Sequence, residues 1–492
     1  MIGLLGRKIK KVVIIEPKSA DRQVYGLFKI PRGVVLLATI LKTLGYEVKV
    51  YCEDFAQIDW DDVLSADVVC LSLLTATAKR GYAVAKEVRV REIRAGAPYK
   101  PIIMGGVHPT FATEEALVNS ADFVVRHEGD KTLPELLEAI EGKRELESVL
   151  GIAFFRDNQV IKTAERPFLT NEELDELPFP DKTLVVNWEE ITTDLVITSR
   201  GCPFNCNFCS VTAMFGRKFR IRSVKRVLDE LEVLSVNAGG KRIVVFIGDD
   251  NFTAKEKRAV EIGDGIIERG LNLSMIIQAR TNTSEATLAA LKRAGVGRVC
   301  VGLESVSDEA LKESNKRQEV KDIINFIERC DRVGVKIHGM FVSGFDNDTP
   351  RTIRGIVKFA KKYRRILETI QITILTPFPG TILYDLMVSG GDIVFHDWDL
   401  YNTHTVVHLP KKMKPSELQR ETYLAMKRFY SVYGIFISLL KLNKTSIVIS
   451  LFGWTEARRW RWGKGFRSHM RILRRMERRG LFTQNVLPDT TS

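Results

Sequence analysis

The segment RGCPFNCNFCS, residues 200–210, places cysteines at positions 202, 206 and 209. The chain of 492 residues has seven cysteines, so nearly half of its thiols fall within one short segment. Thiolates are soft ligands that suit zinc ions and iron–sulfur clusters. A structural zinc site typically has four ligands in C-x2-C pairs, but this segment offers three in a C-x3-C-x2-C spacing, and no histidine occurs between residues 128 and 337. Three thiolates on a four-iron cluster would leave one iron open to a further ligand.

The cysteine segment follows the first of six apolar runs that alternate with helical patterns. The expected strands are 194–200, 242–250, 273–280, 298–305, 335–344 and 369–377, and the expected helices between them include 223–236, 255–269, 284–294 and 319–333. Six such units predict a partial (β/α)6 barrel of the TIM type over residues 191–410. Active sites of these barrels lie at the C-terminal ends of the strands, which is where the cysteines are expected.

An earlier set of alternating runs predicts a second α/β domain over residues 1–150. Its expected strands are 11–16, 46–52, 66–73, 100–106 and 121–127, with helices such as 33–44 and 78–94 between them. Continuous β-branched runs with helical crossovers predict a doubly wound parallel sheet of the flavodoxin or Rossmann type. Residues 151–190 are expected to be a linker, with a hairpin turning at Asp157–Asn158 and a Pro-rich, acidic connector. Residues 411–492 are expected to form a helical, basic C-terminal region.

The composition is that of a folded globular protein, with 45% hydrophobic and 27% charged residues. The odd number of cysteines indicates reduced thiols, and the N-terminal residues lack the pattern of a secretory signal, so we expect a cytoplasmic protein. The net charge of +13 is concentrated near the C-terminus, because residues 455–479 contain ten Arg or Lys and two Glu. Any basic partner surface is therefore expected there.

The cysteine spacing, its place after a strand and Phe208 before the last cysteine resemble the radical S-adenosylmethionine (SAM) superfamily. Later strand ends extend the resemblance: GDDNFT (248–253), QAR (278–280), GLES (302–305), GMFVSGFD (339–346) and LTPFPGTILYD (375–385). The resemblance implies that Cys202, Cys206 and Cys209 are the catalytic centre and the metal ligands of a [4Fe–4S] cluster, which cleaves SAM reductively to a 5′-deoxyadenosyl radical. The implied SAM-binding residues are Phe208, Asp249, Asp250, Gln278, Arg280, Glu304, Ser305 and Gly344. Acidic residues at strand ends also cap helices, so Asp249, Asp250 and Glu304 have that alternative.

The order of domains is similar to that of the cobalamin-binding branch of this superfamily, which includes the hopanoid C-2 and C-3 methylases among its class B methyltransferases. The segments LSLLTAT (71–77), MGGVHPTF (104–111) and RHEGD (126–130) carry this resemblance. The implied cobalamin-binding residues are Ser72, Thr75, Gly105, Gly106, His108, Thr110, Glu128 and Gly129. The loop after the first strand departs from the D-x-H-x-x-G pattern and has no histidine, so cobalamin would bind without a lower histidine ligand or would have been lost. A loop histidine bonded to the backbone is the alternative for His108.

The resemblance implies an enzyme, most simply a cobalamin-dependent methyltransferase that acts on an unactivated sp3 carbon of a lipid or other hydrophobic substrate. It also implies an external electron donor of the flavodoxin or ferredoxin type. One alternative is a radical SAM enzyme that forms a C–C bond, cyclises or oxidises a lipid without methyl transfer. A methylthiotransferase is disfavoured because the first domain lacks three further cysteines. From a different class, the remaining alternative is a non-catalytic, zinc-stabilised protein that binds RNA or membranes.

The C-terminal region offers a second kind of partner. The apolar segment 433–454 is interrupted by Lys441, Asn443 and Lys444, which argues against a transmembrane helix. The arginine- and tryptophan-rich segment after it suits a helix in an anionic membrane interface, whereas RNA binding and a solvated helix face are the alternatives. We expect peripheral membrane association and disfavour nucleic acid. Five aromatic or polar residues would contact substrate or pack over the barrel rim: His396, Asp397, Trp398, Tyr401 and His404.

Overall fold

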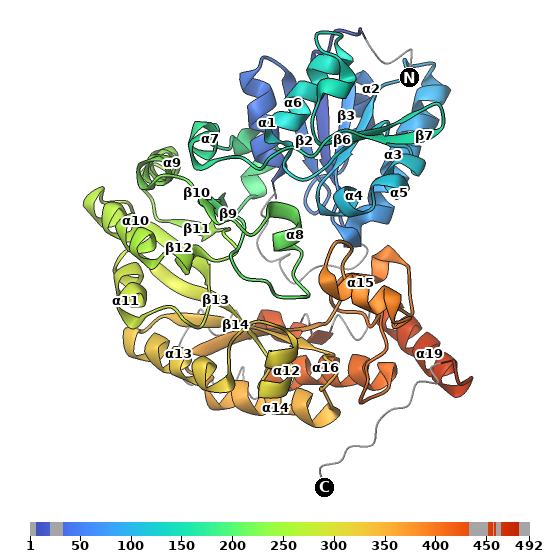
Figure 1. Ribbon diagram of the computed structural model, residues 1–492. Coiled ribbons are helices and arrows are strands. Elements are labelled where there is room, and N and C mark those ends of the chain that lie inside the picture. Colours follow the sequence, from blue (N-terminus) through green and yellow to red (C-terminus); the bar gives the residue numbers. More distant parts are fainter. Residues whose placement is uncertain (1–5, 20–32, 432–450, 456, 459–463, 482–492) are drawn as a thin grey trace. The chain divides into compact units, whose positions relative to one another are not determined.

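The computed structural model describes residues 6–19, 33–431, 451–455, 457–458 and 464–481 (Figure 1). The chain forms two compact units. The first comprises Met1–Leu195, Ser199–Pro203 and Ser210–Arg226, and the second comprises Val196–Thr198, Phe204–Cys209 and Val227–Ser492. The predicted loop after the first strand and most of the apolar segment 433–454 lie outside the described residues.

The first unit is built on a sheet with the strand order β2-β1-β3-β4-β5-β6-β7. The strands are β1 (Lys11–Glu16), β2 (Glu47–Cys52), β3 (Val68–Ser72), β4 (Ile102–Gly105), β5 (Phe123–Val125), β6 (Ile152–Arg156) and β7 (Gln159–Lys162). The first five pair in parallel, and their buried β-branched runs are typical of a sheet covered on both faces. The predicted doubly wound domain is confirmed, with all five expected strands present.

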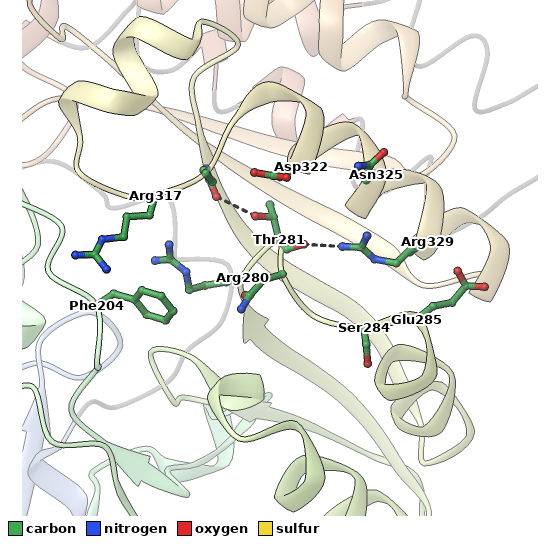
Figure 2. Close-up of a pocket in the computed structure, with 11 residues that line it drawn as sticks. Phe204, Arg280, Thr281, Ser284, Glu285, Arg317, Asp322, Asn325 and Arg329 are labelled. Carbon is green, nitrogen blue, oxygen red and sulfur yellow. Dashed lines mark hydrogen bonds between the residues drawn. The ribbon is translucent and has the colours of Figure 1, made fainter.

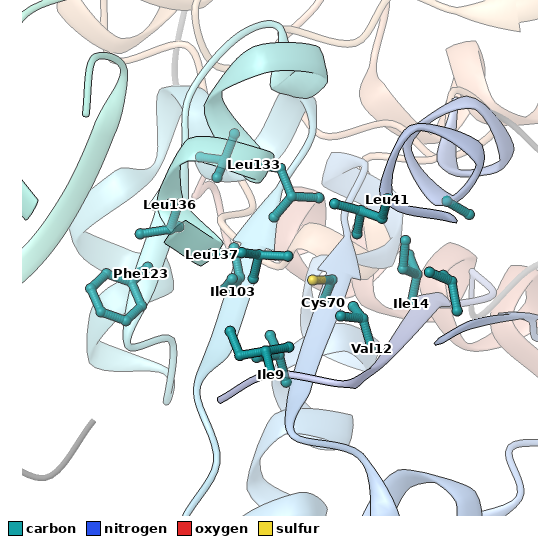
Figure 3. Packing of buried hydrophobic residues seen from close by; sticks show 14 of the residues in the cluster. Ile9, Val12, Ile14, Leu41, Cys70, Ile103, Phe123, Leu133, Leu136 and Leu137 are labelled. Atoms are coloured by element: carbon teal, nitrogen blue, oxygen red, sulfur yellow. The ribbon is translucent and has the colours of Figure 1, made fainter. Parts of the chain in front are cut away.

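Helices connect these parallel strands. They are α1 (Val34–Thr43), α2 (Trp60–Ser65), α3 (Ala78–Ala95), α4 (Val107–Phe111), α5 (Thr113–Val118) and α6 (Gly129–Ile140). Figure 3 shows Leu41 of α1 and Leu133, Leu136 and Leu137 of α6 packed over strand residues such as Ile14 and Ile103. Full burial of one such side chain contributes roughly 1.5–3 kcal/mol to folding. This core fixes the strand ends from which the functional loops emerge.

The hairpin predicted at Asp157–Asn158 is present, and it extends the first sheet. β6 pairs antiparallel with both β5 and β7. Asp157 and Asn158 have φ angles of 48° and 61°, as a tight turn that matches strand twist requires. The first unit also contains α7 (Asn171–Glu176), α8 (Val211–Phe215) and a short ribbon of β9 (Ser199–Arg200) with β10 (Arg220–Ile221).

The second sheet has the order β15-β14-β13-β12-β11-β8. Its strands are β8 (Asp194–Val196), β11 (Ile243–Ile247), β12 (Leu273–Ala279), β13 (Val296–Glu304), β14 (Lys336–Ser343) and β15 (Leu367–Ile374). The pairs from β11 to β15 are parallel. Six strands in sequence order confirm the predicted partial barrel, whose C-terminal strand ends lie at one edge.

The strands of the second sheet are separated by helices whose ends the sequence marks clearly. These are α9 (Val224–Asn237), α10 (Glu256–Glu268), α11 (Glu285–Arg293), α12 (Asp308–Glu313), α13 (Val320–Val333), α14 (Pro350–Lys362) and α15 (Ile382–Ser389). α14, for example, starts with proline, which suits the first helical turn, after Thr349, whose side chain accepts a hydrogen bond from the backbone of Thr352. α13 stops at Gly334, which has a left-handed φ of 76°.

Helices also form the described part of the C-terminal region. α16 (Pro415–Phe429) packs against α14 and β15, and α19 (Lys464–Arg478) packs against α16. The Tyr423 and Phe466 rings lie 5.3 Å apart between their centroids, and the Ser416 hydroxyl donates to Glu477 at 2.7 Å. None of the helices within the described ranges is long and apolar enough to cross a membrane.

Candidate active site

The three clustered cysteines differ from the other four in their exposure. Cys202, Cys206 and Cys209 are partly exposed, whereas the remaining cysteines are buried. Burial raises the pKa of the Cys70, Cys300 and Cys330 thiols to about 12. A metal ligand must be a thiolate, so the buried cysteines are unsuited to that role. The chemistry of the donor set therefore fits a cluster held by residues 202, 206 and 209.

In the second unit, the part of the loop with Cys206 and Cys209 is held by amide side chains. Asn207 donates from its side chain to the carbonyl of Glu313 at 2.9 Å, and Asn315 donates to the carbonyl of Asn205 at 2.8 Å. The backbone N–H of Leu383 donates to the Asn207 carbonyl at 3.0 Å. The loop thus has fixed bonds to the chain after β13 and to α15.

Aromatic residues position the same loop. Phe208 packs edge to face on Phe345, with 6.3 Å between ring centroids. The Arg280 guanidinium at the end of β12 lies 3.7 Å from the centre of the Phe204 ring and donates to the Cys206 sulfur at 3.9 Å. Arg280 therefore fixes Phe204 and Cys206 of the loop against the end of β12.

Cys202 belongs to the first unit, where its N–H donates to the Gly216 carbonyl at 3.3 Å. The preceding Gly201 has a φ of 82°, and a Cβ there would lie 2.5 Å from the Lys218 carbonyl oxygen, so only glycine fits. Within the part of the chain that the structure describes, no three His, Cys, Asp or Glu side chains form a site for a single metal ion.

Asp249 is buried just after the end of β11, and it fixes the chain that follows β8. Its carboxylate accepts hydrogen bonds from the Thr198 N–H and hydroxyl, both at 2.6 Å. Arg258 of α10 donates to the Thr198 carbonyl at 3.0 Å. The Asp249 carboxylate therefore makes its hydrogen bonds to other groups of the protein.

Asp250, the next residue, is exposed, but neighbouring protein atoms displace part of the water around its carboxyl. This loss of solvation, together with the adjacent Asp249 charge, raises the pKa of the Asp250 carboxyl to about 7. A perturbed pKa of this kind is frequent at functional sites. Gln278 of β12 donates to the Asp249 carbonyl at 3.1 Å and so fixes the backbone of this pair.

Glu304 lies at the end of β13 with a φ of 57°, and its carboxylate forms an ion pair with Lys316. Lys316 also donates to the Gly302 carbonyl at 2.6 Å, and a Cβ at Gly302 would lie 2.1 Å from the lysine nitrogen. Strained backbone at a non-glycine residue is found preferentially at functional sites. Ser305 is buried, and its hydroxyl accepts a hydrogen bond from the Ser307 N–H at 3.2 Å.

Gly344 follows the last residue of β14 and has a φ of 105°. Its N–H donates to Asp348 at 2.8 Å, and its carbonyl lies 3.1 Å from a ring nitrogen of His408. Burial raises the pKa of Asp348 to about 6 and lowers that of His408 to about 4.

Among the five residues expected at the barrel rim, Tyr401 is fully buried and donates to the Phe395 carbonyl, which favours packing for this residue.

In the first unit, the strand order has a switch point between β1 and β3. Ligands of doubly wound sheets bind outside the carboxyl ends of the strands at such a point. Ser72 is the last residue of β3, and Thr75 follows in the next loop. These two predicted residues therefore lie at the position that the topology favours for a ligand.

The loop after β4 is built on two predicted glycines. A Cβ at Gly106, which has a φ of 97°, would lie 2.8 Å from the Leu73 carbonyl oxygen, whereas at Gly105 it would have ordinary contacts. The Thr110 hydroxyl donates to the Gly106 carbonyl at 2.8 Å and accepts from the His127 N–H at 3.0 Å. Gly106 thus lets the loops after β3 and β4 approach closely.

His108 is fully buried in the first unit. Its Nε2 lies 3.1 Å from the hydroxyl of Tyr82 in α3 and 3.7 Å from a Glu115 oxygen. The histidine therefore holds α4 against α3. Its ring contacts side chains, whereas the alternative interpretation from the sequence was a ring bonded to the backbone.

Glu128 lies within a buried charge cluster that the sequence did not reveal. It accepts from Arg200 at 3.1 Å and Arg220 at 2.9 Å, and Asp130 accepts from Arg200 at 2.7 Å. Burial alone would raise the pKa of Asp130, but the Arg200 charge holds it below its usual range. Gly129 begins α6 between these two acids. The cluster ties the loop after β5 to the residue just before Gly201 and Cys202.

Comparisons with known proteins follow the same division of the chain. Residues 196–360 match the model of the radical SAM superfamily, and residues 21–137 match that of the B12 binding domain. An uncharacterized methyltransferase of Pyrococcus horikoshii is 31% identical over 441 residues, covering 87% of this chain and 93% of the relative. The chain belongs to the cobalamin-binding branch of the radical SAM superfamily. It is therefore an enzyme, in a family of cobalamin-dependent methyltransferases.

Two further relatives indicate the breadth of this branch. An anaerobic magnesium-protoporphyrin IX monomethyl ester cyclase of Cereibacter sphaeroides is 27% identical and covers 87% of this chain and 71% of the relative. The hopanoid C-3 methylase of Methylococcus capsulatus is 24% identical and covers 81% of this chain and 76% of the relative. Among solved structures, the cobalamin-dependent radical enzyme OxsB has the same fold, with a TM-score of 0.69, 16% identity and coverage of 98% of this chain and 74% of that one.

Membership of this branch implies three cofactors: a [4Fe–4S] cluster, SAM and cobalamin. The residues present fit them. The partly exposed thiols suit the cluster, the perturbed Asp250 lies at a strand end where SAM would bind, and the glycine-lined loops follow the switch point of the first sheet. The radical SAM and cobalamin interpretation of the sequence is thus confirmed at the level of family, fold and cofactors.

Proposed function

We propose that this enzyme methylates an unactivated sp3 carbon of a hydrophobic, lipid-like small molecule. The observation that carries the proposal is the combination, in one chain, of a radical SAM region and a B12 binding domain, shared over nearly the full length of a methyltransferase relative. The similarity to the hopanoid C-3 methylase supports a lipid-like substrate.

When bound, the reduced cluster and SAM supply a carbon radical that removes a hydrogen atom, and cobalamin supplies the methyl group. The chain itself binds and orients these partners. Cys202, Cys206 and Cys209 would hold the cluster, and Arg280 would position Cys206 through its contact with the sulfur.

For SAM, the residues divide into contacts and supports. We assign the methionyl ammonium of SAM to Asp250. Its carboxylate is exposed, so a ligand can reach it. It has also lost part of its hydration, which a bound ammonium would replace. Asp249 and Gln278 would act as positioning residues, because their side chains bind the protein. Phe208, Glu304, Ser305 and Gly344 remain predicted SAM contacts at the ends of the later strands.

For cobalamin, Ser72, Thr75, Gly105, Gly106 and Thr110 would shape the cradle at the ends of β3 and β4. His108 and Glu128 are bonded within the unit, so their support for the cradle would be indirect. Gly129 would contribute backbone at the start of α6.

Two partners complete the proposal. An electron carrier of the flavodoxin or ferredoxin type would reduce the cluster. The exposed arginines of α19 would attract an anionic membrane surface, because Leu473 and Met470 are buried inside the protein and the solvent-facing side carries arginines together with one exposed apolar residue, Ile472. This geometry supports peripheral electrostatic binding rather than insertion. RNA remains the disfavoured alternative.

A radical reaction without methyl transfer is the second candidate, and the similarity to the magnesium-protoporphyrin ester cyclase supports it. The two candidates differ in products. Methylation should convert SAM to S-adenosylhomocysteine and 5′-deoxyadenosine in equal amounts, whereas the second reaction should form 5′-deoxyadenosine without matching S-adenosylhomocysteine.

The test uses the full-length protein, purified anaerobically, reconstituted with iron, sulfide and cobalamin, and reduced with dithionite in the presence of SAM and a lipid extract. Chromatography of both nucleoside products distinguishes the candidates. Cys206→Ala should abolish 5′-deoxyadenosine formation while the corrinoid absorbance of the purified protein persists. Cys300→Ala, which alters a buried strand cysteine, is the matched control and should keep the activity. Zinc without iron and sulfide in the purified protein, or undiminished 5′-deoxyadenosine from Cys206→Ala, would contradict the proposal.

A further inference from the structure

A pocket of about 540 Å³ lies in the second unit beside the cysteine loop, between the segment after β12 and helix α13. Figure 2 shows Arg280 and Arg317 extending toward Phe204, while Arg329 and Asn325 enter from α13. The volume is within the range of small-molecule sites.

Three arginines line this pocket, and none has a carboxylate within ion-pair distance among the described residues. Arg280 donates to the carbonyl of Lys316, and Arg329 donates to the carbonyl of Thr281 at 2.6 Å. Arg317 is exposed, with a left-handed φ of 56°. Like charges that line one pocket repel each other, and carbonyl dipoles compensate them only in part. An anion in the pocket would remove this repulsion.

The acidic residues of the pocket are already bonded elsewhere. Glu285 accepts from Arg332 at 2.7 Å, and Asp322 accepts from the backbone N–H of Glu319 at 2.9 Å. Two carboxylates beside three arginines leave the lining with a net positive charge, although Glu285 compensates Arg329 in part.

An unsatisfied donor supports the same conclusion. The Nε of Arg329 is buried and has no hydrogen-bond partner among the described residues. A buried donor without a partner is unfavourable, because it has lost its hydrogen bonds to water and gained none in the protein. A ligand oxygen that enters the pocket could accept this bond, as guanidinium groups favour planar, bidentate contacts with phosphate and carboxylate.

We propose that this pocket binds a multiply charged oxyanion, carried by a phosphorylated or polycarboxylate small molecule, through Arg317 and Arg329. Asn325 lines the same wall and would add a neutral donor. Arg280 forms the boundary toward Cys206, so the bound anion would lie near the cluster loop. The binding itself does not depend on the methylation proposed above.

Calorimetric titration of the anaerobic holoprotein tests the pocket, with pyrophosphate in one arm and citrate in the other to distinguish the two sources. Because one charge-assisted hydrogen bond contributes about 1.5–3 kcal/mol, Arg317→Ala and Arg329→Gln should each weaken binding of the preferred anion by about 10-fold or more. Arg351→Ala, which removes an exposed arginine of α14, changes the net charge equally and should leave the affinity unchanged.

Melting temperatures of the variants show whether Arg329→Gln still folds, and exposed Arg317 provides an independent variant. Absence of binding of either anion at millimolar concentration would refute the proposal. Equal weakening by Arg351→Ala would show that the anion responds only to the general positive charge of the protein, and this result would also overturn the proposed site. Loss of anion binding in saturating SAM would show that the pocket is part of the SAM site, which would also overturn it.

Discussion

Asp249 and Asp250 are neighbours in sequence with different environments. Asp249 is buried and accepts two hydrogen bonds from Thr198, whereas Asp250 faces the accessible strand end and has a pKa of about 7. The segment GDDNFT predicted both as SAM-binding residues, but it could not assign their roles, because the hydrogen bonds of Asp249 come from Thr198, which lies 51 residues earlier in the chain.

The raised pKa of Asp250 predicts pH-dependent SAM binding. The carboxyl is protonated below about pH 7, so it should attract the SAM ammonium only at higher pH. SAM affinity measured by equilibrium dialysis should rise from pH 6 to pH 8. Asp250→Asn should weaken binding at pH 8 by about 10-fold, as expected for the loss of one charged hydrogen bond, and should flatten this part of the profile. An unchanged affinity would exclude the assignment.

Asp250 should also affect stability in the absence of SAM. Its carboxyl has a folded pKa above the ordinary 3.8, so its contribution to stability is fully present below that value and is lost as the pH rises through about 7. Thermal unfolding of the SAM-free protein should therefore show a decrease in melting temperature from pH 5 to pH 8 that is smaller in Asp250→Asn.

The Asp130–Arg200 pair predicts a large effect of a small substitution. Asp130→Asn would leave the Arg200 charge buried with one carboxylate partner fewer, and breaking a buried pair typically costs about 3–5 kcal/mol. Denaturant unfolding should show this loss. Asp331→Asn, which breaks a surface pair with Arg365, should cost about 1 kcal/mol or less. Equal costs would contradict the structural role given to the buried cluster. The sequence could not reveal this cluster, because Arg200 is 70 residues from Asp130 and Arg220 is 92 residues from Glu128.

At the scale of elements, hydrophobic patterning predicted the parallel strands β1 to β5 of the first sheet and the strands of the second sheet, because each lies in an apolar run bounded by turn residues. The hairpin of β6 and β7 was recognised from its turn, yet it was assigned to a connector. Its place in the first sheet depends on pairing with β5, and strand alternation alone does not specify the partner. The expected strand 194–200 is divided in the structure into β8 and β9. The pairing of β9 with β10 was missed because each of these strands has two residues, too few for a period.

The approach of the loops after β3 and β4 predicts that Gly106 tolerates no side chain. Gly106→Ala would combine a positive φ with a Cβ 2.8 Å from the Leu73 carbonyl oxygen, so we expect a loss of about 1–3 kcal/mol in stability. Cobalamin binding, followed by absorbance, should weaken as well. Gly297→Ala in β13, where a Cβ would meet no atom within 4 Å, is the control and should leave cobalamin binding unchanged.

At the scale of the whole molecule, the charge of +13 is distributed unevenly, with many exposed arginines on α19. Composition located this charge, but it could not show that His469, Met470 and Leu473 pack inward. Burial of these side chains depends on contacts with other elements, such as the carbonyl of Val406, which lies 3.0 Å from a ring nitrogen of His469.

Electrostatic attachment through α19 predicts salt-sensitive binding to anionic vesicles. Sedimentation with phosphatidylserine vesicles should recover the protein at low salt and release it at high salt, and phosphatidylcholine vesicles should not bind it. Each arginine near such a surface contributes about 1 kcal/mol, so Arg471→Gln with Arg475→Gln should weaken binding by about 30-fold. Arg351→Gln with Arg354→Gln on α14 is the control. Salt-insensitive binding would instead indicate apolar insertion.

The unequal burial of the cysteines has a practical consequence. A thiol with a pKa near 12, such as those of Cys70, Cys300 and Cys330, is almost entirely protonated at neutral pH and reacts slowly with alkylating reagents. Brief iodoacetamide treatment of the folded protein should therefore modify the three cysteines of the 202–209 loop, and a bound cluster should protect them. The mass added per chain would then measure the fraction of enzyme molecules that lack their iron.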